Sequence, residues 1–466
     1  MPKAVRRPLR RWLPALALAL ALLPLATCGG GQPEVSPTSS PSPFVPSPIG
    51  DSTVTPTPPA PETPYRFVYR EFGQDQDIIW RVLPSDPSQR EQLAVIPHRQ
   101  GWGIKASLSP DGRLLAYLTM PEGAFDPSFQ AEAYLFSVGK KETRLLAKNV
   151  DLRFRPLWSP DGLLLYVRRN IQQDVYILHI DIPHEPAEGE RTPRRTPAPT
   201  GETPAPEDPV RAAFTANIST ALTFIPIGFA EDGESLYFIQ IQGGTGGGTL
   251  VGSYKPATTS AIATATALAG ATATAVSESG ATIPPEPPPF TPTPGSKLVV
   301  KLTEQIADDY DLSPDKRRLT FRAQALVEGR FVNQAFVADL KGETVQPISA
   351  EGLAPGDQLR PLWHPDGQRV AVGLLPAAAE PSGVALVPIG GGPPSFLWPP
   401  SAGFDEPRSW APDGTYLAVT NYSGDSLANL GTARLDLVAP TGQRLTVAEG
   451  RDNATRDSVL GWFKFE

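Results

Sequence analysis

Three arginines precede a tryptophan at nearly the same distance in three separate parts of the chain. They are Arg155 in LRFRPLW, Arg360 in QLRPLW and Arg408 in DEPRSW. A guanidinium binds carboxylates and phosphates through parallel hydrogen bonds. Three of them at one mouth of a ring would therefore form a site for a partner that presents carboxylates. The alternative is that each arginine pairs with an acidic residue of a neighbouring repeat.

Acidic and phenolic side chains lie in the loops before these arginine positions. Asp308, Asp309 and Tyr310 precede one of the recurring turns described below, and Asp457 precedes the last tryptophan. Loops at the same position of successive repeats open at the same mouth. The candidate ligand-binding set therefore includes Asp308, Asp309 and Tyr310 beside the three arginines.

The chain lacks the sequence signatures of common hydrolase and metal sites. It has four histidines, no Gly-x-Ser-x-Gly elbow and no His-Glu-x-x-His motif. His179 and His184 could hold a metal, but two histidines beside a proline-rich segment are more typical of unrelated side chains. The glycine-rich stretch 243–249 precedes no helix, so it is predicted to be a flexible link rather than a phosphate loop. We predict no catalytic residue, no metal site and no cofactor.

An aspartate-centred turn recurs six times. In the phrase SPDG, proline presets the φ angle, the aspartate carboxylate accepts from nearby backbone N–H groups, and glycine allows the return to a strand. The aspartates are Asp111, Asp161, Asp232, Asp315, Asp366 and Asp413. They could line a calcium-binding ring, but each can cap its own turn, so we predict a structural role for all six. Glu231 replaces the proline of the third turn, and Lys316 replaces the glycine of the fourth.

The residues that flank each turn predict two adjacent strands. Apolar side chains recur at every second position on both sides, as in LWSPDGLLLYV. Successive turn aspartates are 50, 71, 83, 51 and 47 residues apart, and repeats near this length with several strands are typical of propeller blades. One strand with Trp462 follows the last turn and three strands precede the first, so a shared blade can close the ring. The sequence predicts an all-β propeller of seven four-stranded blades over residues 65–466, with six or eight blades as alternatives.

The phrases WSPDG…LLYV and WAPDGTYLAV resemble the propeller repeat of the TolB family. The same repeat occurs in the propellers of tricorn-type and prolyl-oligopeptidase-type peptidases. The resemblance covers roughly residues 65–466 and implies the propeller fold. It implies no single function, because binding proteins and peptidases share the repeat.

The N-terminus has the pattern of an exported lipoprotein. Five basic residues precede the 14-residue apolar run 13–26, which is shorter than a membrane span of ~20 residues and suits a signal peptide over 1–27. The segment LATC resembles a bacterial lipobox and makes Cys28 the site of lipid attachment, although Thr27 departs from the usual Gly, Ala or Ser. The alternative is an incidental thiol. Residues 28–64, rich in Pro, Ser and Thr, are predicted to form a stalk.

Composition also predicts two insertions and excludes one class of partner. The segments at about 185–209 and 256–295 are rich in proline, charge, alanine or threonine, so we expect disordered insertions. The chain has 41 basic and 49 acidic residues, a net charge of −8, and loss of residues 1–27 with their five basic residues makes it −13. This balance argues against a nucleic-acid partner.

Together these features favour a monomeric, non-catalytic binding or scaffold protein. We expect it in the bacterial cell envelope, outside the cytoplasm, anchored to the membrane through lipid on Cys28. Its partner would be a protein, a peptide or a glycan bound on a propeller face. The alternative is a hydrolase or lyase with an active site in the central channel. The scarcity of histidine and the lack of acid–base motifs favour the first class.

Overall fold

The computed structural model describes residues 60–171, 174–182, 210–217, 223–233, 235–242, 248–255, 296–349, 353, 358–376, 382–397 and 399–464. The account below concerns the described residues of the unit Thr57–Glu466. The predicted signal peptide 1–27, Cys28, the stalk up to residue 59 and both insertions (185–209 and 256–295) lie outside the described residues.

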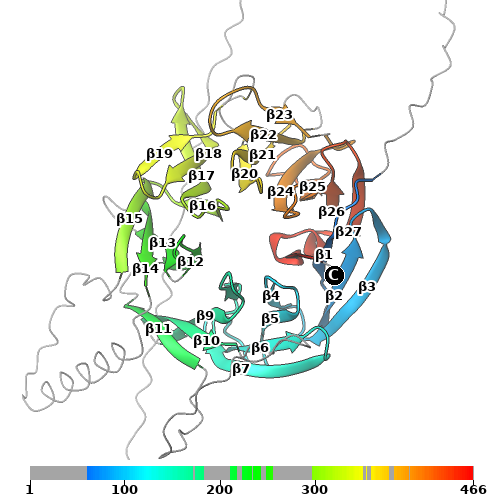
Figure 1. Ribbon diagram of the computed structural model, residues 1–466, viewed down its shortest axis with the longest axis vertical. Helices are drawn as coiled ribbons and strands as arrows, with labels where there is room; N and C mark the ends of the chain where they lie inside the picture. Colours follow the sequence, from blue (N-terminus) through cyan, green and yellow to red (C-terminus); the bar gives the residue numbers. More distant parts are fainter. Residues whose placement is uncertain are drawn as a thin grey trace, which may run out of the picture. The chain divides into compact units, whose positions relative to one another are not determined.

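The strands form seven four-stranded antiparallel sheets around a ring, so the predicted all-β propeller fold is confirmed (Figure 1). The first three sheets are β28 (Val459–Lys464), β1 (Tyr65–Glu71), β2 (Gln76–Leu83) and β3 (Asp86–Pro97); β4 (Lys105–Leu108), β5 (Leu114–Thr119), β6 (Ala131–Ser137) and β7 (Glu142–Val150); and β8 (Leu157–Trp158), β9 (Leu164–Ile171), β10 (Asp174–Asp181) and β11 (Val210–Asn217).

The other four sheets follow in chain order around the ring. They are β12 (Thr223–Phe229), β13 (Leu236–Gln242), β14 (Gly248–Tyr254) and β15 (Ser296–Thr303); β16 (Ala307–Leu312), β17 (Arg318–Val327), β18 (Arg330–Asp339) and β19 (Thr344–Pro347); β20 (Gln358–Trp363), β21 (Arg369–Leu374), β22 (Val384–Pro388) and β23 (Ser395–Phe396); and β24 (Phe404–Trp410), β25 (Leu417–Tyr422), β26 (Ala433–Val438) and β27 (Arg444–Glu449). Among the described residues the helices are two short 3-10 turns, η1 (Arg451–Asn453) and η2 (Arg456–Ser458), and no helix is long and apolar enough to cross a membrane.

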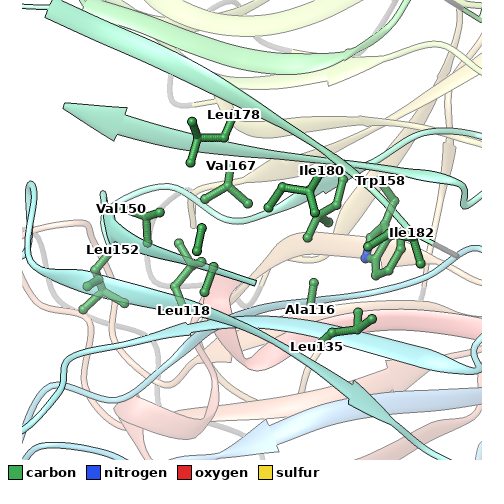
Figure 2. Packing of buried hydrophobic residues seen from close by; sticks show 14 of the residues in the cluster. Ala116, Leu118, Leu135, Val150, Leu152, Trp158, Val167, Leu178, Ile180 and Ile182 are labelled. Carbon is green, nitrogen blue, oxygen red and sulfur yellow. The ribbon is translucent and has the colours of Figure 1, made fainter. Parts of the chain in front are cut away.

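The hydrophobic core lies between neighbouring sheets. Side chains at alternate positions of β5 and β9, such as Leu118 and Val167, meet between their two sheets with Val150 and Trp158 (Figure 2). Period-two alternation puts one side of each strand toward each neighbouring blade, and both sides are apolar in the middle of the sheets. The tryptophans before the turns add contacts between blades, because Trp158 Nε1–H donates to the carbonyl of Ser107, 3.2 Å away in the preceding sheet.

The six turn aspartates act on their own turns. Each carboxylate accepts a hydrogen bond from a backbone N–H two or three residues later in the chain. In the second turn, Asp161 also accepts from the hydroxyl of Ser159, and Gly162 has a φ of 73°. These bonds satisfy backbone groups that the turn removes from the strand ladder, which is a structural role.

Antiparallel pairing places the connections of the ring on two opposite faces. The aspartate turns join the first and second strand of a sheet, and we call their side the turn face. The connections between second and third strands, and those between successive sheets, lie on the other side, which we call the inter-blade face. Arg155, Asp308 and Asp457 lie in or beside connections between successive sheets, so they belong to the inter-blade face.

The two ends of the described chain meet in one sheet. β28 pairs with β1, with Phe67 opposite Trp462, and the rings of these two residues are 4.8 Å apart. Residues just before β1 also contact the ring, because Thr63 Oγ1 donates to Asp413 Oδ2 at 2.6 Å. The packed part of the chain therefore begins slightly before the predicted boundary at residue 65.

Candidate functional site

The connection between β27 and β28 folds into the interior of the ring on the inter-blade face (Figure 1). This connection, residues 450–458, contains η1 and η2. The backbone N–H of Phe72 donates to Asn453 Oδ1 at 2.7 Å, and the hydroxyl of Thr420 donates to the carbonyl of Ala454. We call it the central loop, because it brings side chains from the end of the chain among the innermost strands of other sheets.

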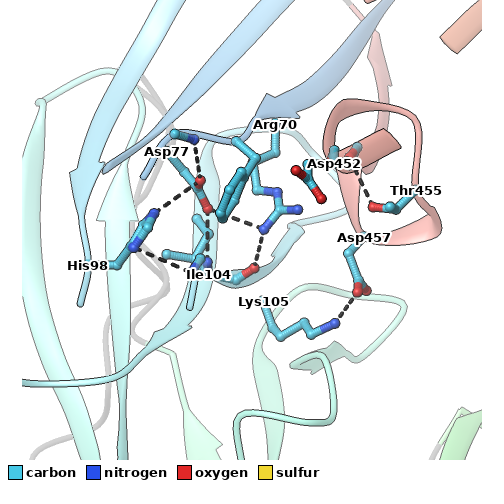
Figure 3. A network of polar contacts seen from close by, with 12 residues as sticks. Arg70, Asp77, His98, Ile104, Lys105, Asp452, Thr455 and Asp457 are labelled. Carbon is cyan, nitrogen blue, oxygen red and sulfur yellow. Dashed lines mark hydrogen bonds and ion pairs between the residues drawn. The ribbon is translucent and has the colours of Figure 1, made fainter. Parts of the chain in front are cut away.

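Arg155 is paired with the central loop. Its Nε lies 3.2 Å from Asp457 Oδ1, its Nη1 donates to the carbonyl of Val459 at 2.9 Å, and its Nη2 donates to the carbonyl of Arg456. Lys105 contacts the other oxygen of the same carboxylate (Figure 3). Burial opposes ionisation of Asp457, but Arg155 and Lys105 outweigh it and lower its pKa to about 2. Arg155 is therefore committed to an internal ion pair.

Arg408 is also satisfied inside the chain. Its two terminal nitrogens contact the two oxygens of Glu406 at 3.1 and 2.8 Å, and its Nε donates to Thr420 Oγ1 at 2.6 Å. The hydroxyl of Tyr422 lies 3.1 Å from Nη2. This two-point ion pair lies within a single strand pair, so it positions the innermost strand β24 and leaves few donors for an external ligand.

The acidic members of the candidate set surround another arginine. Arg322 contacts both oxygens of Asp308 at 2.9 and 2.8 Å and Asp309 Oδ2 at 3.0 Å. Tyr310 donates its hydroxyl to the carbonyl of Ala307, and burial raises the pKa of this phenol. Asp309, which has a φ of 55°, is also 3.8 Å from Nη1 of Arg456 in the central loop. The structure thus brings these residues to one place on the inter-blade face, mostly in pairs.

Arg360 differs from the other two arginines. It lies on the innermost strand β20, only 5% of its surface is exposed, and its Nε and Nη1 are buried with no hydrogen-bond partner among the described residues. Burial lowers its pKa to about 9, with Arg456 and Arg408 acting in the same direction and Asp309 and Asp311 opposing them. Two of the three sequence-equivalent arginines therefore have internal partners, and Arg360 has none within the part of the chain that the structure describes.

A groove of about 410 Å³ lies beside the ion pair of Asp308 and Arg322 on the inter-blade face. Its lining includes the ion pair of Asp308 and Arg322 and two exposed apolar side chains, Ile306 and Leu427. The pair closes the polar side of the groove, and the apolar side chains come from connections of two different sheets. A mixed lining of this kind suits a peptide segment better than a small charged metabolite.

Exposed apolar side chains concentrate on the same face. Eight of the twelve large apolar residues that are exposed among the described residues lie in or beside inter-blade-face connections. They are Trp102, Phe125, Phe129, Ile306, Leu326, Phe331, Phe396 and Leu427. Sequence reasoning missed them. An aromatic residue within a loop-forming stretch, such as Phe125 or Phe129 in PEGAFDPSFQ, was the sequence signal that could have indicated an exposed apolar contact.

The described histidines have structural partners. His98 Nε2 is 3.2 Å from Asp77 Oδ1, and Asp77 also holds Arg70 and accepts from the backbone N–H of Ile104 (Figure 3). His364 contacts Asp366 of its own turn and packs edge-on against Trp410 of the next sheet. Across the described ranges, no group of three or more His, Cys, Asp or Glu side chains could hold a metal ion. The side chains of His179 and His184 lie outside the described residues.

Comparison with known proteins identifies the fold. No protein-family model matches the chain, and no curated protein matches its sequence. Among solved structures, the chain resembles a prolyl endopeptidase with a TM-score of 0.50 and 14% identity, over 84% of this chain and 49% of that one. The fold is that of a β-propeller. The chain spans about half the length of that endopeptidase, so the resemblance covers no complete enzyme.

Further solved structures resemble the chain at lower scores. TolB from Acinetobacter baumannii has a TM-score of 0.39 and 12% identity over 85% of this chain and 86% of its own. An oligogalacturonate lyase from Vibrio parahaemolyticus has a TM-score of 0.47 and 10% identity over 84% and 87%. TolB proteins are thus among the structures that resemble the chain, as the turn phrases predict. At these identities the likeness extends to the fold and not to a partner or a reaction.

Proposed function

We propose that the propeller is a non-catalytic binding or scaffold module whose inter-blade face takes a protein or peptide partner. The observation that carries this proposal is the concentration of exposed apolar side chains on that face, on the connections around a ring of sheets. Aromatic side chains on loops above a rigid scaffold are typical of protein-recognition surfaces, and they cost free energy in water unless a partner covers them.

The polar part of the same face fits a binding role better than a catalytic one. Asp308, Asp309, Arg155 and Arg408 form internal ion pairs. Groups paired in this way make most of their hydrogen bonds within the chain, so they suit holding the shape of a binding surface better than proton transfer to a substrate. The groove beside Asp308 offers a peptide segment both a charged wall and an apolar wall.

We further propose that the protein works outside the cytoplasm, anchored by lipid on Cys28 at the end of the 28–64 stalk, as a monomer and without nucleic acid. The lipobox-like LATC segment and the net charge of −13 after loss of residues 1–27 support this proposal. Replacement Cys28→Ser should abolish lipid labelling in cells that express the full chain. A variant that remains membrane-bound and normally processed would contradict the anchor.

Peptide selection on the mature chain tests the binding function. Peptides selected from a random library on residues 28–466 should bind at least tenfold more weakly to Phe331→Ser or Phe125→Ser variants, because each change removes an exposed aromatic contact. Leu163→Ser is the matched control, since Leu163 is similarly apolar and 38% exposed but lies on the turn face. Equal binding by all variants would place the partner elsewhere. Turnover of pooled peptide, glycan or ester substrates would instead favour a hydrolase or lyase.

A further inference from the structure

Arg360 is a buried cation whose hydrogen bonds are not made within the described chain. None of its nitrogens donates to a described residue or lies within 4.0 Å of a described carboxylate, and Nε and Nη1 are fully enclosed. A buried donor left without an acceptor costs about 1–3 kcal/mol, and a charged group costs more. Such a group in a native protein calls for an acceptor, and the described residues do not provide one.

The surroundings of Arg360 show where that acceptor would sit. β20 is the innermost strand of its sheet, between the innermost strands β16 and β24 of the adjacent sheets (Figure 1). Arg456 of the central loop, Asp309 of β16 and Arg408 of β24 are all close enough to shift its pKa. Arg360 therefore lies on an innermost strand within electrostatic reach of Arg456, which supplies a second positive charge from the central loop.

The charges around Arg360 nearly balance. Glu406 binds Arg408, and Arg322 binds both Asp308 and Asp309. Arg456 reaches Asp309 only at 3.8 Å, and its side chain is 49% exposed. Asp311 accepts from the backbone N–H of Trp363 at 2.7 Å and acts on the charge of Arg360, although burial raises the pKa of this carboxyl. A ligand would therefore be held by the unmade hydrogen bonds of Arg360 rather than by excess positive charge, and a singly charged planar anion suits them better than a doubly charged phosphate.

We infer that Arg360, assisted by Arg456, forms a carboxylate-binding site at the centre of the ring on the inter-blade face. The carboxylate can belong to a small free acid or to the C-terminus of a peptide chain. It would accept hydrogen bonds from the guanidinium of Arg360, beginning at Nη2, the terminal nitrogen that is not among the enclosed, unpartnered atoms. The inference does not depend on the apolar side chains of the proposed binding surface, because it rests on a different set of residues.

Binding of small carboxylates to the mature chain tests this site. The probes are sodium acetate, N-acetyl-trialanine, its C-terminal amide and inorganic phosphate, titrated calorimetrically at matched ionic strength. At least one of the two carboxylates should bind, and the amide should bind at least tenfold more weakly than the peptide acid or not at all. Binding by acetate indicates a free acid as ligand, whereas binding by the peptide acid alone indicates a chain terminus. Either result supports the site.

Two variants and one control locate the binding. Arg360→Met should weaken carboxylate binding at least tenfold, and Arg456→Met, which removes an exposed side chain, should weaken it several-fold with the fold intact. The control is Arg144→Met, which changes an exposed arginine on the outer strand β7 and should bind as the unaltered chain does.

Three outcomes would overturn the inference: equal binding of acid and amide, full binding by both Arg456→Met and Arg360→Met, or tighter Arg360-dependent binding of phosphate. The comparison of acid with amide needs no variant, so it decides the matter even if Arg360→Met does not fold. None of the probes has a large apolar side chain, so their failure would leave the apolar surface untested and intact.

Discussion

Arg155, Arg360 and Arg408 occupy equivalent places in the sequence repeat but have different surroundings. Arg155 meets Asp457 because the central loop, some three hundred residues later, folds beside it. Arg408 meets Glu406 two residues away on the same strand. The residue at the corresponding position before Arg360 is Gln358, which binds Gln334 instead. Equivalent positions were predictable from the repeat, whereas partners were not, because they depend on irregular connections.

The turn glycines and Lys316 differ in backbone strain. Gly162 has a φ of 73°, and Lys316 occupies the same place in its turn with a φ of 60°. A side chain in this left-handed region costs roughly 1–2 kcal/mol, whereas glycine adopts it freely. The fourth turn therefore contains strain that the second turn lacks.

Two separate substitutions, one at Lys316 and one at Gly162, should change the free energy of unfolding in opposite directions. We expect Lys316→Gly to raise the free energy of unfolding by roughly 0.5–1 kcal/mol, because strain relief exceeds the added entropy of the unfolded chain. Gly162→Lys should lower it by about 1 kcal/mol, since the nearest atom to an added Cβ, Pro110 Cδ, is at an ordinary 3.6 Å and only the backbone is strained. Urea unfolding of both variants measures the two changes. A loss of stability in both would show that Lys316 has contacts that outweigh its φ.

At the scale of the element, the regular strands were easier to predict than the connections. Strands on both sides of each turn follow from period-two apolar positions, as in β9 and β25. The ten-residue strands β17 and β18 extend beyond the repeat, and their exposed ends carry Leu326 and Phe331. The central loop has no apolar periodicity, so its place inside the ring could not be predicted from the sequence. Its position depends on hydrogen bonds to distant strands.

The ion pairs of Asp457 should make the central loop sensitive to acid. Its folded pKa of about 2 is below the ordinary value of 3.8. Stability from this group is therefore present above about pH 4 and is lost as the pH falls toward 2. We expect Asp457→Asn to lower the free energy of unfolding by roughly 1–2 kcal/mol at pH 7. The difference from the unaltered chain should shrink as the pH falls from about 5 to about 2.

The control for this measurement is Asp452→Asn. Asp452 lies in the same loop, is exposed, and forms no ion pair with a described residue. Urea unfolding at several pH values should show little difference between this variant and the unaltered chain. A constant offset for Asp457→Asn at every pH would mean that the residue acts through packing rather than charge.

At the scale of the whole molecule, the ring joins the two ends of its described chain. β1 has β2 on one side and β28 on the other, and Val459, Leu460, Trp462 and Phe463 are buried there. The sequence suggested this arrangement because Trp462 had no turn after it and three strands had no turn before them. Burial of four large side chains contributes of the order of 6–10 kcal/mol, comparable with the whole stability of a typical domain. We therefore expect the pairing of β28 with β1 to stabilise the whole ring against unfolding.

A disulfide across this pairing tests directly how far the stability of the ring depends on keeping its two ends together. Tyr65 and Lys464 are paired opposite each other in β1 and β28, so cysteines at both positions on a Cys28→Ser background would link the ends of the ring. The bond closes a chain of several hundred residues, and loop-closure entropy predicts a gain of roughly 6 kcal/mol on oxidation. The control is a cysteine pair at Val327 and Arg330, also opposite each other, which closes only a hairpin turn and should gain roughly 2 kcal/mol. Unfolding in urea, with each protein compared oxidised and reduced, gives both values. A gain across β1 and β28 no larger than that of the hairpin would mean that the ends already separate before the ring unfolds, and that the sheets are stable without closure.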